Sequence, residues 1–208
     1  MKRYRINEIF YSLQGEGFHV GEAAVFVRFS GCNLSCSFCD TDFAAFTEMT
    51  ADEIVSAVKA RVLELKGAVT VQSFRDFASQ GILAVLTGGE PTLQADDQLV
   101  GQLQDAGFRV AMESNGTRLA PANLDWLTVS PKAGSRVVVK KCNELKLVID
   151  ERGIIDDYGI EADVYYLQPC DVGDVERNRQ IINRCVGEVM RNPRWRLSLQ
   201  QHKLAGYK

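Results

Sequence analysis

Three cysteines, Cys32, Cys36 and Cys39, lie close together with the spacing C-x3-C-x2-C. Three thiolates on one short loop are one fewer than the four protein ligands of a cubane iron–sulfur cluster in electron transfer. A cluster held by three cysteines keeps one iron open, and an open position on a metal can bind a substrate or cofactor. Zinc is the alternative, with a fourth ligand from elsewhere in the chain. The triplet alone favours an iron–sulfur site over a zinc site.

A glycine-rich turn, Gly88-Gly89-Glu90-Pro91, follows the apolar segment 82–87. Glycine lets the backbone approach a ligand closely because it has no side chain. The cysteine spacing, the aromatic Phe38 before the third cysteine and this turn together resemble the radical S-adenosylmethionine superfamily. The resemblance implies that the open iron binds the amino and carboxylate groups of the methionine moiety, and that the turn hydrogen-bonds the amino group.

Short apolar segments rich in β-branched residues predict buried strands, and apolar residues at helical spacing predict helices. Apolar strands interleaved with helices indicate an α/β protein with a mainly parallel sheet. About six core strands with only about three core helices leave several connections short, so we expect an abbreviated partial (β/α) barrel. The predicted strands span residues 23–29, 82–87, 108–113, 124–129, 144–149 and 164–167, with a closing strand at 194–199, and the predicted helices span residues 51–66, 95–106 and 175–190.

Most polar motifs of the chain come directly after a predicted strand. In parallel α/β sheets the carboxyl ends of the strands lie along one edge, and ligands bind there. The sequence therefore predicts that these motifs meet at one rim of the barrel. They are the cysteine loop and residues 88–91, 113–117, 130–132 and 168–171.

Motifs beyond the cysteine loop narrow the resemblance. The opening FYSLQGEG (10–17), the loop GCNLSCSFCDTDF (31–43) and the ending LSLQQHKLAGYK (197–208) resemble the 7-carboxy-7-deazaguanine synthase family. TGGEP, ESNGT, SPK, ELK and LQP occur between them in the family's order, so the resemblance covers almost the whole chain. It implies ring contraction of 6-carboxy-5,6,7,8-tetrahydropterin to 7-carboxy-7-deazaguanine with release of ammonia, a step of queuosine and 7-deazapurine biosynthesis.

The resemblance also implies a [4Fe–4S] cluster, S-adenosylmethionine and Mg²⁺ as cofactors. A 5′-deoxyadenosyl radical would remove hydrogen from the pterin C6, the substrate radical would rearrange, and S-adenosylmethionine would be regenerated. Cys32, Cys36 and Cys39 would hold the cluster, and Thr41 would bind Mg²⁺, with an ordinary loop hydroxyl as its alternative. The expected S-adenosylmethionine-binding residues are Phe38, Asp40, Gly89, Glu90, Ser130, Pro131, Lys132 and Gln168.

By the same resemblance, the opening, the ending and several strand ends of the chain would bind the pterin. Arg28 suits a carboxylate through a bidentate pair, with a solvent-facing arginine as the alternative. Glu113 suits the guanidine-like edge of the pterin or a turn, and His202 suits proton transfer or the surface. The expected substrate-binding residues are Leu13, Gln14, Gly15, Glu16, Arg28, Thr87, Glu113, His202 and Lys208, with the terminal carboxylate of Lys208 closing over the substrate, and the expected catalytic residues are Glu16, Arg28 and His202.

Composition excludes several other classes of protein. The chain has 208 residues, of which 46% are hydrophobic, and a net charge of −3, which argues against a main role in binding duplex nucleic acid. The longest uncharged run, residues 77–89, is too short to span a membrane, and MKRYRINEIF lacks the apolar run of a signal peptide. We expect one cytoplasmic radical S-adenosylmethionine domain over residues 1–208, with short substrate-binding segments at both ends.

The resemblance suggests a homodimer that receives electrons from a flavodoxin or a ferredoxin. Cys142, Cys170 and Cys185 match no ligand spacing, so we expect them to pack in the fold. An enzyme that installs a glycyl radical on a protein uses the same cysteine triplet, and an electron carrier would need only a fully ligated cluster. The QGEG opening, the CDT sequence and the QxHK ending favour an enzyme with a small-molecule pocket over both alternatives.

Overall fold

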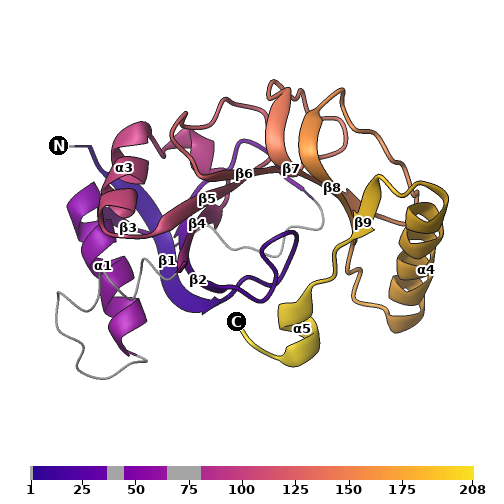
Figure 1. Ribbon diagram of the computed structural model, residues 1–208, viewed down its shortest axis with the longest axis horizontal. Helices are drawn as coiled ribbons and strands as arrows, with labels where there is room; N and C mark the ends of the chain where they lie inside the picture. Colours follow the sequence, from indigo (N-terminus) through magenta and orange to yellow (C-terminus); the bar gives the residue numbers. More distant parts are fainter. Residues whose placement is uncertain (1, 37–44, 65–80) are drawn as a thin grey trace.

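One sheet organises the backbone of the computed structural model, which describes residues 2–36, 45–64 and 81–208 (Figure 1). Within these ranges the strand order is β3-β1-β2-β4-β5-β6-β7-β8-β9. Every neighbouring pair from β2 to β9 is parallel, whereas β1 is antiparallel to both β2 and β3. The strands are β1 (Tyr4–Leu13), β2 (Ala23–Phe29), β3 (Thr47–Met49), β4 (Leu83–Gly88), β5 (Arg109–Ser114), β6 (Trp126–Val129), β7 (Lys141–Ile149), β8 (Glu161–Pro169) and β9 (Trp195–Leu197).

The sheet is an open arc, because β3 and β9 stand at its two ends and do not pair with each other. The expected mainly parallel partial barrel is therefore confirmed. Its helices in the described ranges are α1 (Ala51–Glu64), α3 (Asp97–Asp105), α4 (Val175–Arg191) and α5 (Gln201–Ala205), with a 3₁₀ turn η1 (Pro91–Leu93). None of these helices combines the length and hydropathy that crossing a bilayer requires. The three predicted core helices correspond to α1, α3 and α4, although residues 65 and 66 lie outside the described ranges.

Capping side chains fix where the core helices begin. At α1, the amide of Glu53 donates to Thr50 Oγ1 at 3.3 Å and the amide of Thr50 donates to Glu53 Oε2 at 2.7 Å. This reciprocal pair is the capping box that the sequence predicts. Asp96 and Asp174 accept backbone hydrogen bonds from the first turns of α3 and α4.

The prediction from sequence lacks β1 and β3 and begins β7 and β8 three residues too late. β1 mixes apolar with polar and charged residues, and most of its residues are only partly buried. A search for continuous apolar segments misses such a strand, because those segments are typical of parallel strands covered on both faces. The described chain therefore has more strands than the approximately six core strands expected.

Two apolar cores cover the convex face of the arc, and Figure 1 shows α1 and α3 at one end and α4 at the other. Val25, Val27 and Phe29 of β2 belong to the core under α1 and α3. Leu145 and Leu147 of β7 belong to the core under α4. Because successive side chains of a strand point to opposite faces, the residues between them face the hollow side of the arc. The hollow side also holds the segment after β1 and the short helix α5 (Figure 1).

Candidate active site

A cavity of about 360 Å³ opens at the carboxyl ends of the parallel strands, on the hollow side of the arc. The predicted polar rim is therefore present. The cavity brings together most of the residues that the sequence predicts, although they lie far apart along the chain. These are Leu13, Gln14, Gly15, Glu16, Arg28, Cys32, Cys36, Thr87, Gly89, Glu113, Ser130, Lys132, Gln168, His202 and Lys208.

Of six further predicted residues, the two that lie within the described ranges are not part of this lining. The side chain of Glu90 is fully buried elsewhere, and Pro131 is buried behind the rim. The other four, Phe38, Cys39, Asp40 and Thr41, lie outside the described residues.

The cysteine loop and the glycine turn are joined by backbone hydrogen bonds. The amide of Gly89 donates to Phe29 O at 3.0 Å, and the amide of Glu90 donates to Gly31 O at 2.9 Å. A β-carbon on Gly89 would lie 1.9 Å from Gly31 O, so only glycine permits this approach. The turn thus holds the start of the cysteine loop against the end of β2.

The described part of the cysteine loop has the chemistry that an iron–sulfur cluster requires. Cys32 and Cys36 are partly buried and line the cavity. The amide of Leu34 donates to Cys32 Sγ at 3.4 Å. Hydrogen bonds to ligand sulfurs tune such clusters, and thiolates are their usual ligands. The residues present therefore fit a cluster at this end of the cavity.

Glu90 is 0% exposed, and its carboxylate accepts hydrogen bonds from other residues of the protein. Oε1 accepts from Thr92 Oγ1 at 2.5 Å and from Ser114 Oγ at 2.8 Å, and Oε2 accepts from the amide of Asn115 at 2.7 Å. These contacts tie η1 to the end of β5. Glu90 therefore supports the cofactor end of the rim from behind, by fixing the turn that carries Gly89.

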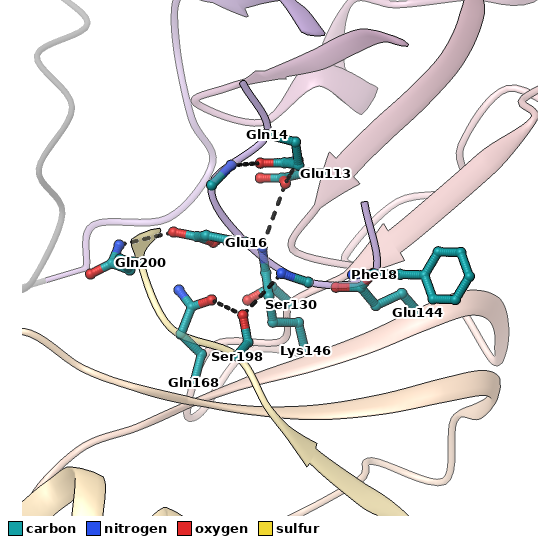
Figure 2. A network of polar contacts seen from close by, with 12 residues as sticks. Gln14, Glu16, Phe18, Glu113, Ser130, Glu144, Lys146, Gln168, Ser198 and Gln200 are labelled. Carbon is teal, nitrogen blue, oxygen red and sulfur yellow. Dashed lines mark hydrogen bonds and ion pairs between the residues drawn. The ribbon is translucent and has the colours of Figure 1, made fainter. Parts of the chain in front are cut away.

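A polar network of other residues also lines the cavity (Figure 2). The ammonium of Lys146 donates to Glu16 Oε2 at 2.7 Å and lies 3.5 Å from Glu113 Oε1. Gln14 Nε2 donates to Glu113 Oε1 at 3.0 Å, and Gln200 Nε2 donates to Glu16 Oε1 at 2.9 Å. The network joins the segment after β1 to β5, β7 and the C-terminal segment.

Burial and charge act against each other in this network. Burial favours the neutral form of Glu16, but the Lys146 ammonium and hydrogen bonds from two glutamines outweigh it and hold the pKa of Glu16 well below its usual value. Burial likewise opposes the charge of Lys146, but the carboxylates of Glu113, Glu16 and Glu144 raise its pKa above the usual value. At neutral pH, Glu16 is therefore ionised and Lys146 protonated.

Other titratable groups near this network shift because they are desolvated. Burial raises the pKa of Glu144, whose Oε2 accepts from the amide of Phe18 at 3.0 Å. Burial lowers the pKa of Lys132, and the neighbouring Lys146 ammonium lowers it further. Lys132 Nζ donates to Ser130 Oγ at 2.8 Å, which anchors its ammonium at the rim.

Arg28 lines the cavity with a side chain that is 24% exposed. Its Nε donates to Glu8 Oε1 at 2.9 Å, and its guanidinium carbon lies 5.8 Å from the centre of the Phe10 ring. Arg28 therefore does not simply face solvent. Its guanidinium is oriented by a carboxylate on one side and an aromatic face on the other.

The C-terminal segment closes the open side of the cavity. Gly15 O accepts from the amide of Gln201 at 2.9 Å, and a β-carbon on Gly15 would lie 2.3 Å from His202 Nδ1. His202 therefore packs directly against the backbone of the QGEG segment. The backbone carbonyl of Lys208 accepts from Ser12 Oγ at 2.6 Å, which holds the end of the described chain at the cavity.

Lys146 and Gln200 belong to this network but are not among the site residues predicted from sequence. Both occur inside motifs that carry the family resemblance, ELK and LSLQQHK, but neither received a role. Lys146 has a further signal in the sequence, because a lysine rarely stands within an apolar strand such as ELKLVI unless its charge is paired. Gln200 has no comparable signal, since its place depends on how the C-terminal segment folds back.

Comparison with known proteins gives the class of this site. The Radical SAM superfamily matches residues 26–152, which is more than half of the chain. The chain is therefore a radical S-adenosylmethionine enzyme, the class that the cysteine loop and glycine turn indicate. This class uses a [4Fe–4S] cluster and S-adenosylmethionine.

Full-length relatives give the family. The 7-carboxy-7-deazaguanine synthase of Bacteroides thetaiotaomicron is 46% identical over 200 residues, 96% of each chain. That of Bradyrhizobium diazoefficiens is 40% identical over 216 residues, 98% of each chain. The crystal structure of QueE from Escherichia coli has a TM-score of 0.69 at 26% identity and covers 96% of this chain and 95% of that one. The chain belongs to the 7-carboxy-7-deazaguanine synthase family.

Proposed function

We propose that the cavity contracts the ring of 6-carboxy-5,6,7,8-tetrahydropterin to give 7-carboxy-7-deazaguanine and ammonia, a step of queuosine biosynthesis. The observation that carries this proposal is that two chemically different groups of residues line one cavity. Cys32, Cys36 and Gly89 form the first group, and Glu16, Glu113 and Lys146 form the second. The conversion is redox-neutral overall, because the product is the substrate less one ammonia. Such a reaction needs a radical initiator and a fixed polar substrate site.

The cysteine end of the cavity is proposed to hold the cofactors. Cys32 and Cys36 would bind the cluster together with Cys39. The rim residues Gly89, Ser130, Lys132 and Gln168 would bind S-adenosylmethionine with Phe38 and Asp40, while Glu90 and Pro131 support that rim. When bound, the reduced cluster and S-adenosylmethionine supply a 5′-deoxyadenosyl radical that removes the hydrogen at C6 of the pterin. The protein itself orients the substrate and excludes water from it.

The polar residues of the cavity are proposed to bind the pterin through charge and hydrogen bonding. Arg28 would pair with the substrate carboxylate, since a guanidinium matches that group in charge and geometry. Glu16 and Glu113 would accept hydrogen bonds from the N–H groups of the pyrimidine edge. His202 would move a proton as ammonia leaves, because an imidazole can both donate and accept near neutral pH. Leu13, Gln14, Gly15, Thr87 and the carboxylate of Lys208 would complete the substrate pocket.

Several further features are proposed on the family resemblance. Thr41 would bind Mg²⁺ together with substrate oxygens, in keeping with the preference of Mg²⁺ for few protein ligands. The whole chain would act as one domain, which the single sheet supports. It would work in the cytoplasm as a homodimer, reduced by a flavodoxin or ferredoxin, without binding nucleic acid or membranes. Sedimentation of the reconstituted enzyme tests the dimer, and chelation of Mg²⁺ should lower turnover.

Two measurements on anaerobically reconstituted enzyme test the main proposal. Adding S-adenosylmethionine should change the EPR spectrum of the reduced cluster, which an electron carrier with four cluster ligands would not show. Adding the carboxytetrahydropterin should then give a product with the ultraviolet absorbance and mass of the carboxydeazaguanine. An intact cluster that responds to S-adenosylmethionine but yields no such product contradicts the proposed substrate and favours an activating enzyme.

A further inference from the structure

Lys146 is the most buried charged group of the cavity, with a side chain only 4% exposed. It stands on β7 among apolar neighbours that point into the core under α4. Burying an ammonium costs several kcal/mol, and its attraction to carboxylates often only offsets that cost. Replacing a whole buried ion-paired cluster by hydrophobic side chains of similar volume is often neutral or stabilising, whereas removing the lysine alone leaves its carboxylate partners unpaired. Stability therefore does not explain why the cluster as a whole is charged.

The ammonium contacts two carboxylates that come from different parts of the chain. Glu16 belongs to the segment after β1, and Glu113 belongs to β5. Both carboxylates approach the same nitrogen, so without the cation they would repel each other and one would tend to take up a proton. Lys146 therefore allows two ionised carboxylates to stand side by side at the wall of the cavity.

Each carboxylate keeps the capacity to accept from a ligand. Among the described residues, the hydrogen bonds of Glu113 all use Oε1. Glu16 accepts from Lys146 on Oε2 and from Gln200 on Oε1, with Gln168 as a further donor, and a carboxylate oxygen can accept more than one hydrogen bond. Figure 2 shows the two carboxylates, Gln14 and Lys146 close together. The wall presents its full set of acceptors only if both groups are ionised, because protonation turns one acceptor oxygen into an O–H donor.

We propose that Lys146 is a positioning residue, whose buried ammonium holds the carboxylates of Glu16 and Glu113 side by side as a paired acceptor for the N–H groups of the pterin. This inference rests on the proposed function, which supplies the substrate. Lys146 itself makes no bond that changes in the reaction. Its action is to hold these acceptors in place and to keep Glu16 deprotonated across the pH range in which the enzyme works.

Among the described residues, the titratable groups nearest this pair are Glu144 on β7, whose carboxylate also faces Lys146, and Lys132 after β6. His19 acts on Glu144, Cys36 acts on Lys132, and His202 packs against Gly15 beside Glu16. Glu144 adds negative charge to the cluster and Lys132 adds positive charge. Replacing Lys146 with a neutral residue therefore leaves the partly buried Glu16 and Glu113 beside a third carboxyl group, without the ammonium that contacts both of them. The pKa of Glu16 should then rise.

The experiment compares pterin affinity from pH 5.5 to 8 in anaerobic, cluster-loaded protein with S-adenosylmethionine present. The variants are Lys146→Met, Lys146→Gln and Lys146→Arg, with Lys141→Met as a matched control on the exposed end of the same strand. Affinity is measured by calorimetry, KM and kcat are measured separately, and the EPR response to S-adenosylmethionine checks the cofactor end. Dividing each affinity by that of the unmodified enzyme at the same pH removes titration of the substrate.

The neutral variants should bind pterin about 10- to 100-fold more weakly at pH 6, mainly through KM, and recover as the pH rises. Lys146→Arg keeps the cation, so its relative affinity should not depend on pH, and Lys141→Met should match the unmodified enzyme. The EPR response should persist in every variant. Unchanged pterin affinity in the neutral variants, a loss without pH dependence, or a pH-dependent Lys146→Arg each overturns the proposal. Failure of the unmodified enzyme to bind the pterin would instead contradict the proposed function.

Discussion

Two glutamates, the fully buried Glu90 and the partly buried Glu16, differ in what surrounds them. Within the described residues no cation pairs with the carboxylate of Glu90, which accepts hydrogen bonds from hydroxyl and backbone N–H groups. The carboxylate of Glu16 is paired with the Lys146 ammonium and a glutamine amide. The first is enclosed by the fold, whereas the second lines the cavity.

This difference separates a residue that stabilises the site from a residue that faces the ligand. A carboxylate whose partners are backbone groups fixes the path of the chain, because moving it would leave several buried donors without acceptors. A carboxylate balanced by another side chain can stay ionised while it faces a ligand. Glu90 should therefore act mainly on stability and cofactor binding, and Glu16 mainly on the substrate.

Replacing Glu90 should give the largest effect, because Glu90→Ala leaves the hydroxyls of Thr92 and Ser114 and the amide of Asn115 without their acceptor. Unfolding free energy should fall by about 3–5 kcal/mol, measured by urea denaturation. The EPR response to S-adenosylmethionine should weaken as well. The exposed Glu64→Ala is the control and should stay within about 0.5 kcal/mol of the unmodified protein. If Glu90→Ala has normal stability, Glu90 does not stabilise the turn that carries Gly89.

Replacing Glu16 should affect the substrate more than the fold. Glu16→Gln keeps the shape of the side chain but removes the charge that faces Lys146, so binding of the pterin in the transition state should weaken by about 2–3 kcal/mol. This loss is measured as kcat/KM with a normal EPR response to S-adenosylmethionine. Unfolding free energy should change by less than in Glu90→Ala, because Glu113 and Glu144 still balance Lys146. Equal losses of stability in the two variants would mean that Glu16 stabilises the fold as much as Glu90 does.

Much of the fold and of the candidate site could be predicted from sequence, and the features that could not be predicted have a physical cause. Local spacing was sufficient for the parallel strands, the core helices and the residues at strand ends. The antiparallel β1 was missed because its residues are only partly buried. Glu90 was assigned to the cofactor by its motif, but its side chain turns away from the cavity, and sequence does not reveal side-chain direction at a turn.

The cysteines show the same limit. Burial raises the pKa of Cys142 to about 12 and that of Cys185 to about 11, which agrees with the expected packing roles. Cys170 is also buried, and burial raises its pKa, but it lines the cavity. Its position depends on how the end of β8 meets the rim, and this long-range arrangement is not encoded in the spacing of nearby residues.

Acid should reduce the contribution of Glu16 to stability. Because the folded-state pKa of Glu16 lies below its unfolded value, the stabilisation is complete above the unfolded pKa and is lost as the pH falls through the folded pKa. The difference in unfolding free energy between the unmodified protein and Glu16→Gln should therefore narrow as the pH falls below about 4.5. Denaturant titrations at pH 7, 4.5 and 3.5 measure it. A difference that widens on acidification would mean that Glu16 is not held ionised by Lys146.

The smallest expected effect concerns Ser198, which links the C-terminal segment to the backbone of Gly17, next to Glu16. Its Oγ accepts from the amide of Gly17 at 3.0 Å and contacts Gln168 Oε1 at 3.0 Å. Ser198→Ala leaves a buried amide unpaired, so unfolding free energy should fall by about 1 kcal/mol and KM for the pterin should rise a few-fold. Ser135→Ala is the matched control, since within the described residues the buried Ser135 Oγ has no hydrogen-bond partner. Its removal should be neutral or slightly stabilising. If the two serine variants behave alike in denaturant and in KM, the Ser198 link does not position the QGEG segment, and the other contacts of that segment, including those of Gln200 and Gln201, are sufficient to hold it.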